Sequence, residues 1–355
     1  MLETRLANQR LTRTTFRRAD QVVSWLGAVQ AQDYAGAQWG VALRARGLST
    51  AAIDRAYAAG QILRTHVMRS TWHLVAAADV RWLQALTGPR VQMSVRGHGR
   101  RIGLDTRTIT RARMLIERAL EGGRYLTRAE LSEVLRRGRI EAEGQRLAVL
   151  VMDAELEAAI CSGPSRGRQF TYALVAERAP DARVLRRDEA LAELAMRYFQ
   201  SHGPATVHDF SWWSGLTVAD ARAGAATVPG ELVLRTPPPL DAVTGADYLL
   251  PNYDEYLIAY RHRGAVIEPQ RSRNLGVFTS VEHPHHIVLD GRVAGSWCRT
   301  IGPRTATVGV TFYAPPSAAA RAAIVTQAER YGQALGVPCA VEVAAPASRR
   351  RTASG

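Results

Sequence analysis

The stretch TRARMLIERALEGGRYLTRAEL, from Thr110 to Leu131, decides how the first half of this chain can fold. Its first part predicts a helix, because apolar residues recur at the spacing that brings side chains to one helix face. Those residues are Met114, Leu115, Ala119 and Leu120. Two glycines then interrupt the pattern, and Thr127 with Glu130 matches a capping box that starts a second helix. A helix, a tight turn and a capped helix predict a helix-turn-helix.

Looser copies of this arrangement lie on either side. The segment PATVHDF (204–210) follows the helical pattern DEALAELAMRYFQSHG (188–203) and places Thr206 before Asp209. The segment RLTRTTF (10–16) places Thr12 four residues before an apolar residue. After the central copy, ICSGPSRGRQFTYALV (160–175) is typical of two short strands that form a wing. We therefore predict three winged-helix modules, which span 1–103, 104–182 and 183–238.

The composition of the sequence changes beyond residue 236. TPPPLD (236–241) is a linker signal, and short β-rich runs follow it. One of them, IVLDGRVAG (287–295), predicts a hairpin with Asp290 and Gly291 at the turn. A last helical pattern begins near residue 317. We expect a C-terminal β-barrel with a closing helix over 239–345, a disordered basic tail over 346–355, and an α+β fold for the whole chain.

Composition limits the classes of partner. The chain has 355 residues, of which 46% are hydrophobic, and a formal net charge of +14; every basic residue is arginine. No run approaches the roughly 20 apolar residues that span a bilayer, and the three cysteines form no disulfide framework. We expect a cytoplasmic monomer that is drawn to polyanions, nucleic acid above all. The alternative is a GC-rich genome that favours arginine without any nucleic-acid role.

A short motif near the N-terminus, GAVQAQDYAG (27–36), carries two glutamines two residues apart. On a helix Gln30 and Gln32 would point to nearly opposite sides, whereas on an extended segment they share a face. If both amides serve one site, the chain here is extended. The alternative is a solvated helix end. Asp33 follows directly and is a further acid at this place.

Two other segments carry candidate site residues. In HVMRSTWHLV (66–75), Arg69, Thr71 and His73 alternate and would share one face of a strand, near Gln30 and Gln32. A structural role for His73 is equally open. The tryptophans of SWW (211–213) are expected in the core.

The remaining polar clusters predict no cofactor site. In LPNYDEYLIAYRHR (250–263), the adjacent acids Asp254 and Glu255 point to different sides in any regular structure, which argues against a paired-carboxylate site. The cluster His283, His285 and His286 lacks a cysteine or carboxylate partner, so we expect no metal site. No Walker lysine, dinucleotide fingerprint or nucleophile elbow is present, and we expect no cofactor.

Taken in order, five motifs resemble one family. QAQD (30–33), RSTWHLV (69–75), GPATVHDFSWWSGL (203–216), LPNYDEYLIAYRHR (250–263) and LDGRVAGSW (289–297) look like the AlkZ-like and YcaQ-like winged-helix DNA glycosylases. The resemblance implies three tandem winged helices in a concave arrangement with a C-terminal β-barrel. It also implies monofunctional excision of alkylated purines, chiefly N7-alkylguanines, from double-stranded DNA, and unhooking of interstrand crosslinks.

The resemblance also implies roles for residues. The catalytic motif of the family corresponds to Gln30 and Gln32, in a branch that includes self-resistance enzymes of producers of DNA-alkylating antibiotics. Asp33, just after the motif, is a departure from the pattern. We hypothesise that Gln32 orients a water and Gln30 holds the lesion or the deoxyribose, while Arg292 beside the predicted hairpin reaches a DNA groove. The rivals are a non-catalytic winged-helix DNA-binding regulator and a metal-dependent hydrolase.

Overall fold

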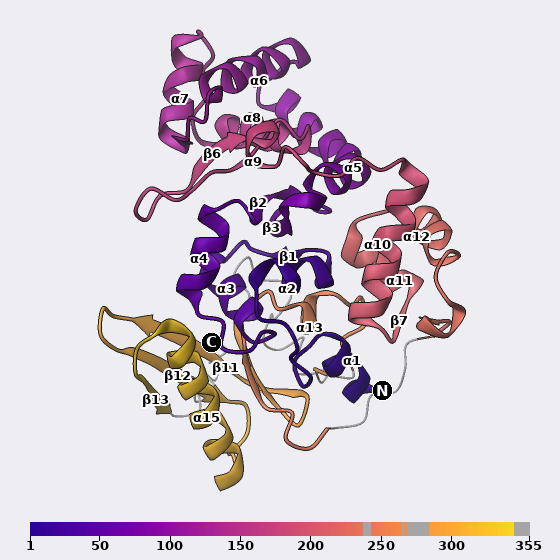
Figure 1. The fold of residues 1–355 in the computed structure, drawn as a ribbon, viewed down its shortest axis with the longest axis vertical. Helices are drawn as coiled ribbons and strands as arrows, with labels where there is room; N and C mark the ends of the chain where they lie inside the picture. The colour runs from indigo at the N-terminus through magenta and orange to yellow at the C-terminus, as the bar shows by residue number, and fades with distance from the viewer. Residues whose placement is uncertain (237–242, 265, 268–283, 344–355) are drawn as a thin grey trace, which may run out of the picture.

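The computed structural model describes residues 1–236, 243–264, 266–267 and 284–343 (Figure 1). The predicted linker, His283 and the tail over 346–355 lie wholly or largely outside the described residues. Within the described part, no helix is both long and apolar enough to cross a membrane. Helices and strands both occur throughout, so the predicted α+β class is confirmed.

Four helices surround a small sheet in the N-terminal region. They are α1 (Leu2–Asn8), α2 (Ala19–Leu26), α3 (Tyr34–Ala42) and α4 (Thr50–Ala58), and the strands are β1 (Val29–Gln30), β2 (Ile62–Val67) and β3 (Thr71–Ala76). The strand order is β1-β3-β2, which makes β1 an edge strand. Gly27, with φ of 83°, ends α2, and Asp33 caps α3. Strand β1 lies between these two helix boundaries.

The Thr12 copy of the predicted repeat starts no helix. Thr12 lies in irregular chain, and α2 begins later, at Ala19. Position 15 holds threonine, so Thr12 lacks the Glu or Gln three residues later that completes a capping box.

The central region contains the helix-turn-helix that the sequence predicts. Its elements are η1 (Ala77–Asp79), α5 (Val80–Arg101), α6 (Thr106–Leu120), β4 (Leu126–Thr127), α7 (Arg128–Arg137), α8 (Gly144–Leu156), β5 (Ile160–Ser162), β6 (Thr171–Leu174) and α9 (Val175–Arg178). The capping box is present, since the Thr127 N–H donates to Glu130 at 2.7 Å and the Glu130 N–H donates back to the Thr127 hydroxyl at 3.3 Å. Strands β5 and β6 pair as the predicted hairpin.

The third region repeats the capped helix. It comprises α10 (Arg187–His202), β7 (Ala205–Thr206), α11 (Val207–Ser214), α12 (Val218–Ala225), η2 (Gly230–Leu232) and β8 (Val233–Leu234). Thr206 and Asp209 form the expected capping box at the start of α11. These local signals are confirmed, whereas the assignment of three winged-helix modules and their boundaries stays a prediction.

The C-terminal region forms an open sheet, so the predicted β-barrel is wrong for the described strands. The elements are β9 (Tyr248–Leu250), α13 (Glu255–Ile258), β10 (His285–Leu289), β11 (Arg292–Ile301), β12 (Ala306–Phe312), α15 (Ala318–Leu335) and β13 (Cys339–Val343). The order is β13-β12-β11-β10-β9, and no described strand joins β13 to β9. The sheet buries its apolar residues against the rest of the protein. Trp39 of α3 donates to the Leu249 carbonyl and packs edge-on against Tyr331 of α15.

Three hydrophobic clusters hold the regions together. The first joins α1–α4 to the C-terminal sheet, and the second joins β2 and β3 to α10, α11 and α12. The third contains the second half of α5 with α6, α7 and α8. Figure 1 shows α6 and α7 at one end of the molecule and β12, β13 and α15 at the other. Strand β1, which carries the glutamine motif, lies between them.

Candidate active site

The motif that contains Gln30 and Gln32 begins on β1, at the edge of the N-terminal sheet. Gln30 ends β1 and lies opposite His73 of β3. The Ala31 N–H continues the pairing by donating to the Trp72 carbonyl at 2.7 Å. Gln30 therefore lies on extended chain, whereas Gln32 follows in a bend, so the shared use of both amides at one site stays a prediction.

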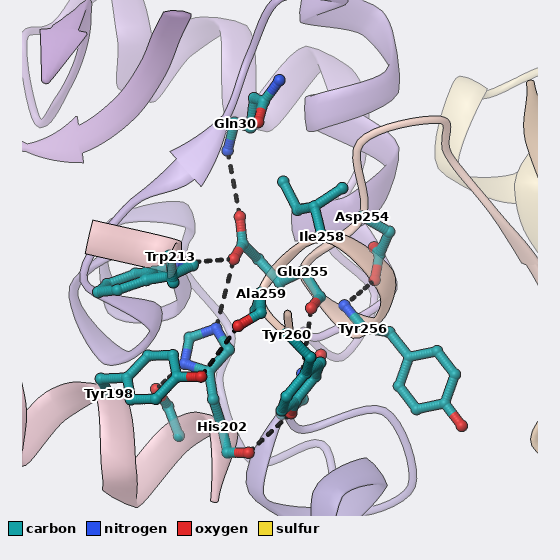
Figure 2. A network of polar contacts seen from close by, with 12 residues as sticks. Gln30, Tyr198, His202, Trp213, Asp254, Glu255, Tyr256, Ile258, Ala259 and Tyr260 are labelled. Atoms are coloured by element: carbon teal, nitrogen blue, oxygen red, sulfur yellow. Dashed lines mark hydrogen bonds and ion pairs between the residues drawn. The ribbon is translucent and has the colours of Figure 1, made fainter. Parts of the chain in front are cut away.

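Gln30 is buried and held from both sides, as Figure 2 shows in part. Its N–H donates to Glu255 Oε1 at 3.3 Å, and its side-chain oxygen accepts from Arg69 at 3.0 Å. Burial lowers the pKa of Arg69, and the nearby Glu255 carboxylate partly opposes that shift. Because Arg69 occupies the amide oxygen, the amide NH₂ of Gln30 is directed to the other side and is the group that can donate to a substrate.

Gln32, by contrast, is exposed. Its side-chain oxygen accepts from the Trp72 N–H at 3.5 Å, at the outer limit of a hydrogen bond. The side chain is therefore accessible to water and to DNA while its neighbour in the motif is fixed.

The structure brings three of the predicted DNA-binding residues to the motif. Thr71 and His73 lie on β3 as expected, but Arg69 lies in the turn before it, which the positive φ of Met68 allows. Burial and the nearby Arg69 lower the pKa of His73 to about 3, so its ring is neutral at pH 7. His73 Nδ1 lies 2.9 Å from the Thr71 carbonyl, which makes that nitrogen the donor.

Arg292, the fourth predicted residue, lies elsewhere. It is exposed at the start of β11, next to a turn that contacts the rest of the protein. The Gly291 carbonyl accepts from the Tyr256 hydroxyl at 2.7 Å, and the Tyr256 side chain points away from Gln30 in Figure 2. The turn also contacts Leu2. A role for Arg292 in DNA binding stays a prediction.

Asp33, which follows the motif, has a structural environment. Its carboxylate accepts from the Gly36 N–H, which caps α3, and both oxygens contact Arg299 at 2.7 and 2.8 Å. These bonds engage the carboxylate in capping α3 and in an ion pair.

The histidine cluster that the sequence contains has structural contacts at His285. His285 accepts from the Asn252 N–H and stacks on Trp297. Burial, together with Arg299, lowers the pKa of His285 to about 4. Among the described residues, no group of three histidines, cysteines or acids is placed to hold a metal.

The two adjacent tryptophans differ in burial, and the two adjacent acids diverge. Trp213 is in the core, while Trp212 is half exposed. Asp254 pairs with Arg44 and Glu255 faces Gln30, so the acids point to different sides as expected.

Two residues at the motif were not predicted. Glu255 does not form a paired-acid site; its carboxylate accepts from the Gln30 N–H. Arg64 Nε donates to the Ala31 carbonyl at 3.0 Å. A glutamate inside the apolar run DEYLIAY (254–260) was the available signal for Glu255, since an acid is rarely buried without a partner.

Comparison with known proteins agrees with this architecture. The profile of the family described as "DNA glycosylase AlkZ-like" matches residues 23–334. The chain is 28% identical over 330 residues to the "Interstrand DNA cross-link repair glycosylase" of Streptomyces sahachiroi, across 82% of this chain and 85% of that protein.

A solved structure shows a similar fold. The structure titled "Streptomyces sahachiroi DNA glycosylase AlkZ" has a TM-score of 0.74 and 23% identity, and the likeness covers 97% of this chain and 98% of the other. The family profile matches most of the chain, from α2 into α15. The chain therefore belongs to the AlkZ-like family and is a DNA glycosylase, an enzyme that hydrolyses N-glycosyl bonds.

Proposed function

We propose that this enzyme excises N7-alkylated purines from double-stranded DNA, including bulky adducts and interstrand crosslinks, with Gln30 and Gln32 as its catalytic residues. The observation that carries the proposal is a fixed Gln30 at the end of β1 followed, two residues later, by an exposed Gln32. The name of the Streptomyces relative, an interstrand crosslink repair glycosylase, supports the crosslink substrate.

Hydrolysis of the glycosidic bond of an N7-alkylguanine needs little catalytic assistance from the protein. A glutamine is neither an acid nor a base near pH 7, but it positions a water and hydrogen-bonds a sugar or base. An N7-alkylguanine already carries a positive charge, so it leaves without protonation. The deoxyribose becomes oxocarbenium-like, and the water oriented by Gln32 completes hydrolysis while Gln30 holds the lesion or the sugar. A neutral guanine would need more assistance, and weak catalytic groups therefore favour the charged lesion.

The reaction ends at an intact abasic site. Glycosylases that also cut the backbone form a Schiff base between an amine and C1′ of the sugar, most often with a lysine. None of the side chains of this protein is a lysine. No side-chain amine is therefore present to attack the sugar, and water is the nucleophile.

The proposed DNA-binding surface surrounds the motif. Three winged-helix modules in a concave arrangement would reach the glycosidic bond of a bulky adduct that cannot rotate into a tight pocket. Arg69 and Thr71 would line this surface next to the motif, the buried His73 would support it from behind, and Arg292 would contact a groove. The protein would act as a monomer. This chemistry suits self-resistance in a producer of a DNA-alkylating antibiotic as well as general repair.

A panel of duplexes tests the proposal. We would measure release of free modified base from 7-methylguanine, from a bulky N7 adduct and from an N7–N7 crosslink. We expect base release from 7-methylguanine and the bulky adduct, unhooking of the crosslink, and strand cleavage only after added alkali. Tight binding to every duplex without base release would favour a non-catalytic DNA-binding protein. Efficient trapping of a protein–DNA adduct by borohydride would contradict attack by water.

A further inference from the structure

The backbone of the glutamine motif contacts two buried charges of opposite sign. The Gln30 N–H donates to the Glu255 carboxylate, and the Arg64 guanidinium donates to the Ala31 carbonyl, at 3.3 and 3.0 Å. Glu255 is 1% exposed and Arg64 is 8% exposed. We propose that Glu255 and Arg64 are positioning residues, which fix the Gln30–Ala31 backbone and thereby the directions of the two catalytic amides. This inference rests on the proposed function of Gln30 and Gln32.

The edge position of β1 explains why the motif needs such partners. Strand β1 pairs with β3 on one side only, so the Gln30 N–H has no strand to receive it. A buried N–H without a partner is destabilising, and the Glu255 carboxylate supplies the acceptor. A bond between an N–H and a carboxylate is stronger than one between neutral groups. The carboxylate therefore holds the first residue of the motif more firmly than a neutral side chain would.

Glu255 is itself held in place from the third region. Trp213 Nε1 donates to Glu255 Oε2 at 2.8 Å, and His202 Nε2 lies 3.4 Å from the same oxygen. Figure 2 shows the carboxylate between Gln30 on one side and Trp213 and His202 on the other. Removing a carboxylate from water is unfavourable by several kcal/mol before its partners compensate. An apolar side chain would fill this place without that penalty, which points to a purpose for the charge.

Glu255 also acts on the Gln30 side chain through Arg69. Arg69 donates to the Gln30 amide oxygen and is half-buried, and Glu255 is the carboxylate that attracts its positive charge. Loss of the negative charge would leave Arg69 less favourable in its half-buried position. One residue thus stabilises both the backbone and the amide orientation of Gln30.

Arg64 holds the other end of the motif and connects it to the central region. Its guanidinium lies over the rings of Trp72 and Phe170, at 4.2 and 4.5 Å from their centroids. The backbone N–H of Arg64 donates to the Ser162 hydroxyl at 2.8 Å. A planar guanidinium both stacks between two rings and donates from Nε, whereas a lysine ammonium does neither in this geometry. Arg64 therefore links the Ala31 carbonyl to the hairpin of β5 and β6.

Two substitutions with matched controls test the proposal. Glu255→Gln removes the charge at constant shape, and Arg64→Lys keeps the charge but loses the planar fork. Asp254→Asn is the control for the first, because Asp254 is adjacent, equally buried and bonded to Arg44 instead. Arg178→Lys is the control for the second, because Arg178 donates to backbone carbonyls in α4, away from the motif.

The measurements are the single-turnover rate of 7-methylguanine release at saturating enzyme, the DNA dissociation constant and the melting temperature of each variant. We expect Glu255→Gln and Arg64→Lys to lower the rate by about 10- to 100-fold, as misplacement of a catalytic group does, with DNA affinity unchanged. Both controls should lose thermal stability and keep the rate within about 2-fold, because Asp254 bonds to Arg44 and Arg178 bonds to α4, and Asn at position 254 still caps α13.

Three results would overturn the proposal. The first is a wild-type rate in Glu255→Gln or Arg64→Lys. The second is an equal rate loss in each variant and its control, which would mark a purely structural role. The third is absence of 7-methylguanine release by the wild-type enzyme, which would also contradict the proposed function and is thereby distinguishable from the first two. If Glu255→Gln does not fold, Trp213→Phe replaces it, since it removes one bond to Glu255 and leaves its charge. An unchanged rate in Trp213→Phe would then overturn the proposal.

Discussion

Gln32 and Asp33 are adjacent polar residues in different environments. Gln32 is exposed, whereas the Asp33 carboxylate is engaged by the Gly36 N–H and by Arg299. Asn in place of Asp33 keeps a cap acceptor and removes only the charge that Arg299 contacts. We therefore expect Asp33→Asn to lower the melting temperature slightly and to leave base release within about 2-fold of wild type, as an ion-pair loss outside the chemistry does. A rate loss larger than that of Gln32→Ala would make Asp33 the base.

The buried His73 predicts a pH dependence of stability. Its pKa is about 3 in the folded protein against 6.5 ordinarily. Between these values the unfolded chain binds a proton that the folded chain does not, so stability is complete above pH 6.5 and falls as the pH drops toward 3. Replacing His73 by Phe should flatten this fall by up to about 1.4 kcal/mol per pH unit. Urea unfolding of wild type and His73→Phe at pH 7 and pH 5 measures this difference. An equal loss of unfolding free energy in the two proteins between these pH values would contradict the buried neutral ring.

For single residues, the sequence indicates the two amides of the motif but not the residues that hold them in place. Gln30 and Gln32 are two apart, and spacing alone predicts how they sit on extended chain. Glu255 contacts Gln30 across 225 positions of sequence, and Arg64 contacts Ala31 across 33. No local pattern encodes either contact, because it depends on how the C-terminal helix α13 and strand β2 pack around β1.

Among the elements, those set by local signals are the ones that the sequence predicts well. The capping boxes at Thr127 and Thr206 depend on residues three apart, and the β10–β11 turn depends on Asp290 and Gly291 alone. Closure of the C-terminal strands into a barrel is not local. Trp39 and other residues of the N-terminal helices cover the sheet, and its strands remain open at β13 and β9.

The β10–β11 turn offers a test of its packing. Gly291 has φ of 78°, and a Cβ there would approach Leu2 Cδ2 to 2.6 Å. Gly122 has nearly the same φ, 77°, with nothing within 4 Å of its added Cβ. Both Gly→Ala variants pay the backbone strain, but only Gly291→Ala adds overpacking, typically about 1–3 kcal/mol. We expect the larger loss of melting temperature in Gly291→Ala, and equal losses would show that the turn is not packed on α1.

At the scale of the whole molecule, the net charge of +14 is the main feature. Part of the arginine content is used inside the protein, as in the buried pair of Arg44 with Asp254 and in the contact of Arg299 with Asp33. Others are exposed, such as Arg107 and Arg118, and the proposed binding surface requires several contacts with DNA phosphates.

Binding to duplex DNA should therefore weaken steeply with salt. Each phosphate contact releases counterions and contributes roughly −0.9 to the log–log slope of affinity against salt concentration. We expect a slope of several units, measured by fluorescence anisotropy on an undamaged duplex from low to moderate salt. A slope near zero would show that the arginines reflect genome composition and not a binding surface.

The central claim is that the exposed glutamine of the motif acts in catalysis and not in binding. The most direct measurement compares wild type and Gln32→Ala for single-turnover release of 7-methylguanine from duplex DNA, with DNA affinity determined in parallel. We predict a rate loss on the order of 10²-fold, comparable to removal of one positioned catalytic donor, at unchanged affinity. Release of 7-methylguanine by Gln32→Ala at the wild-type rate would contradict it.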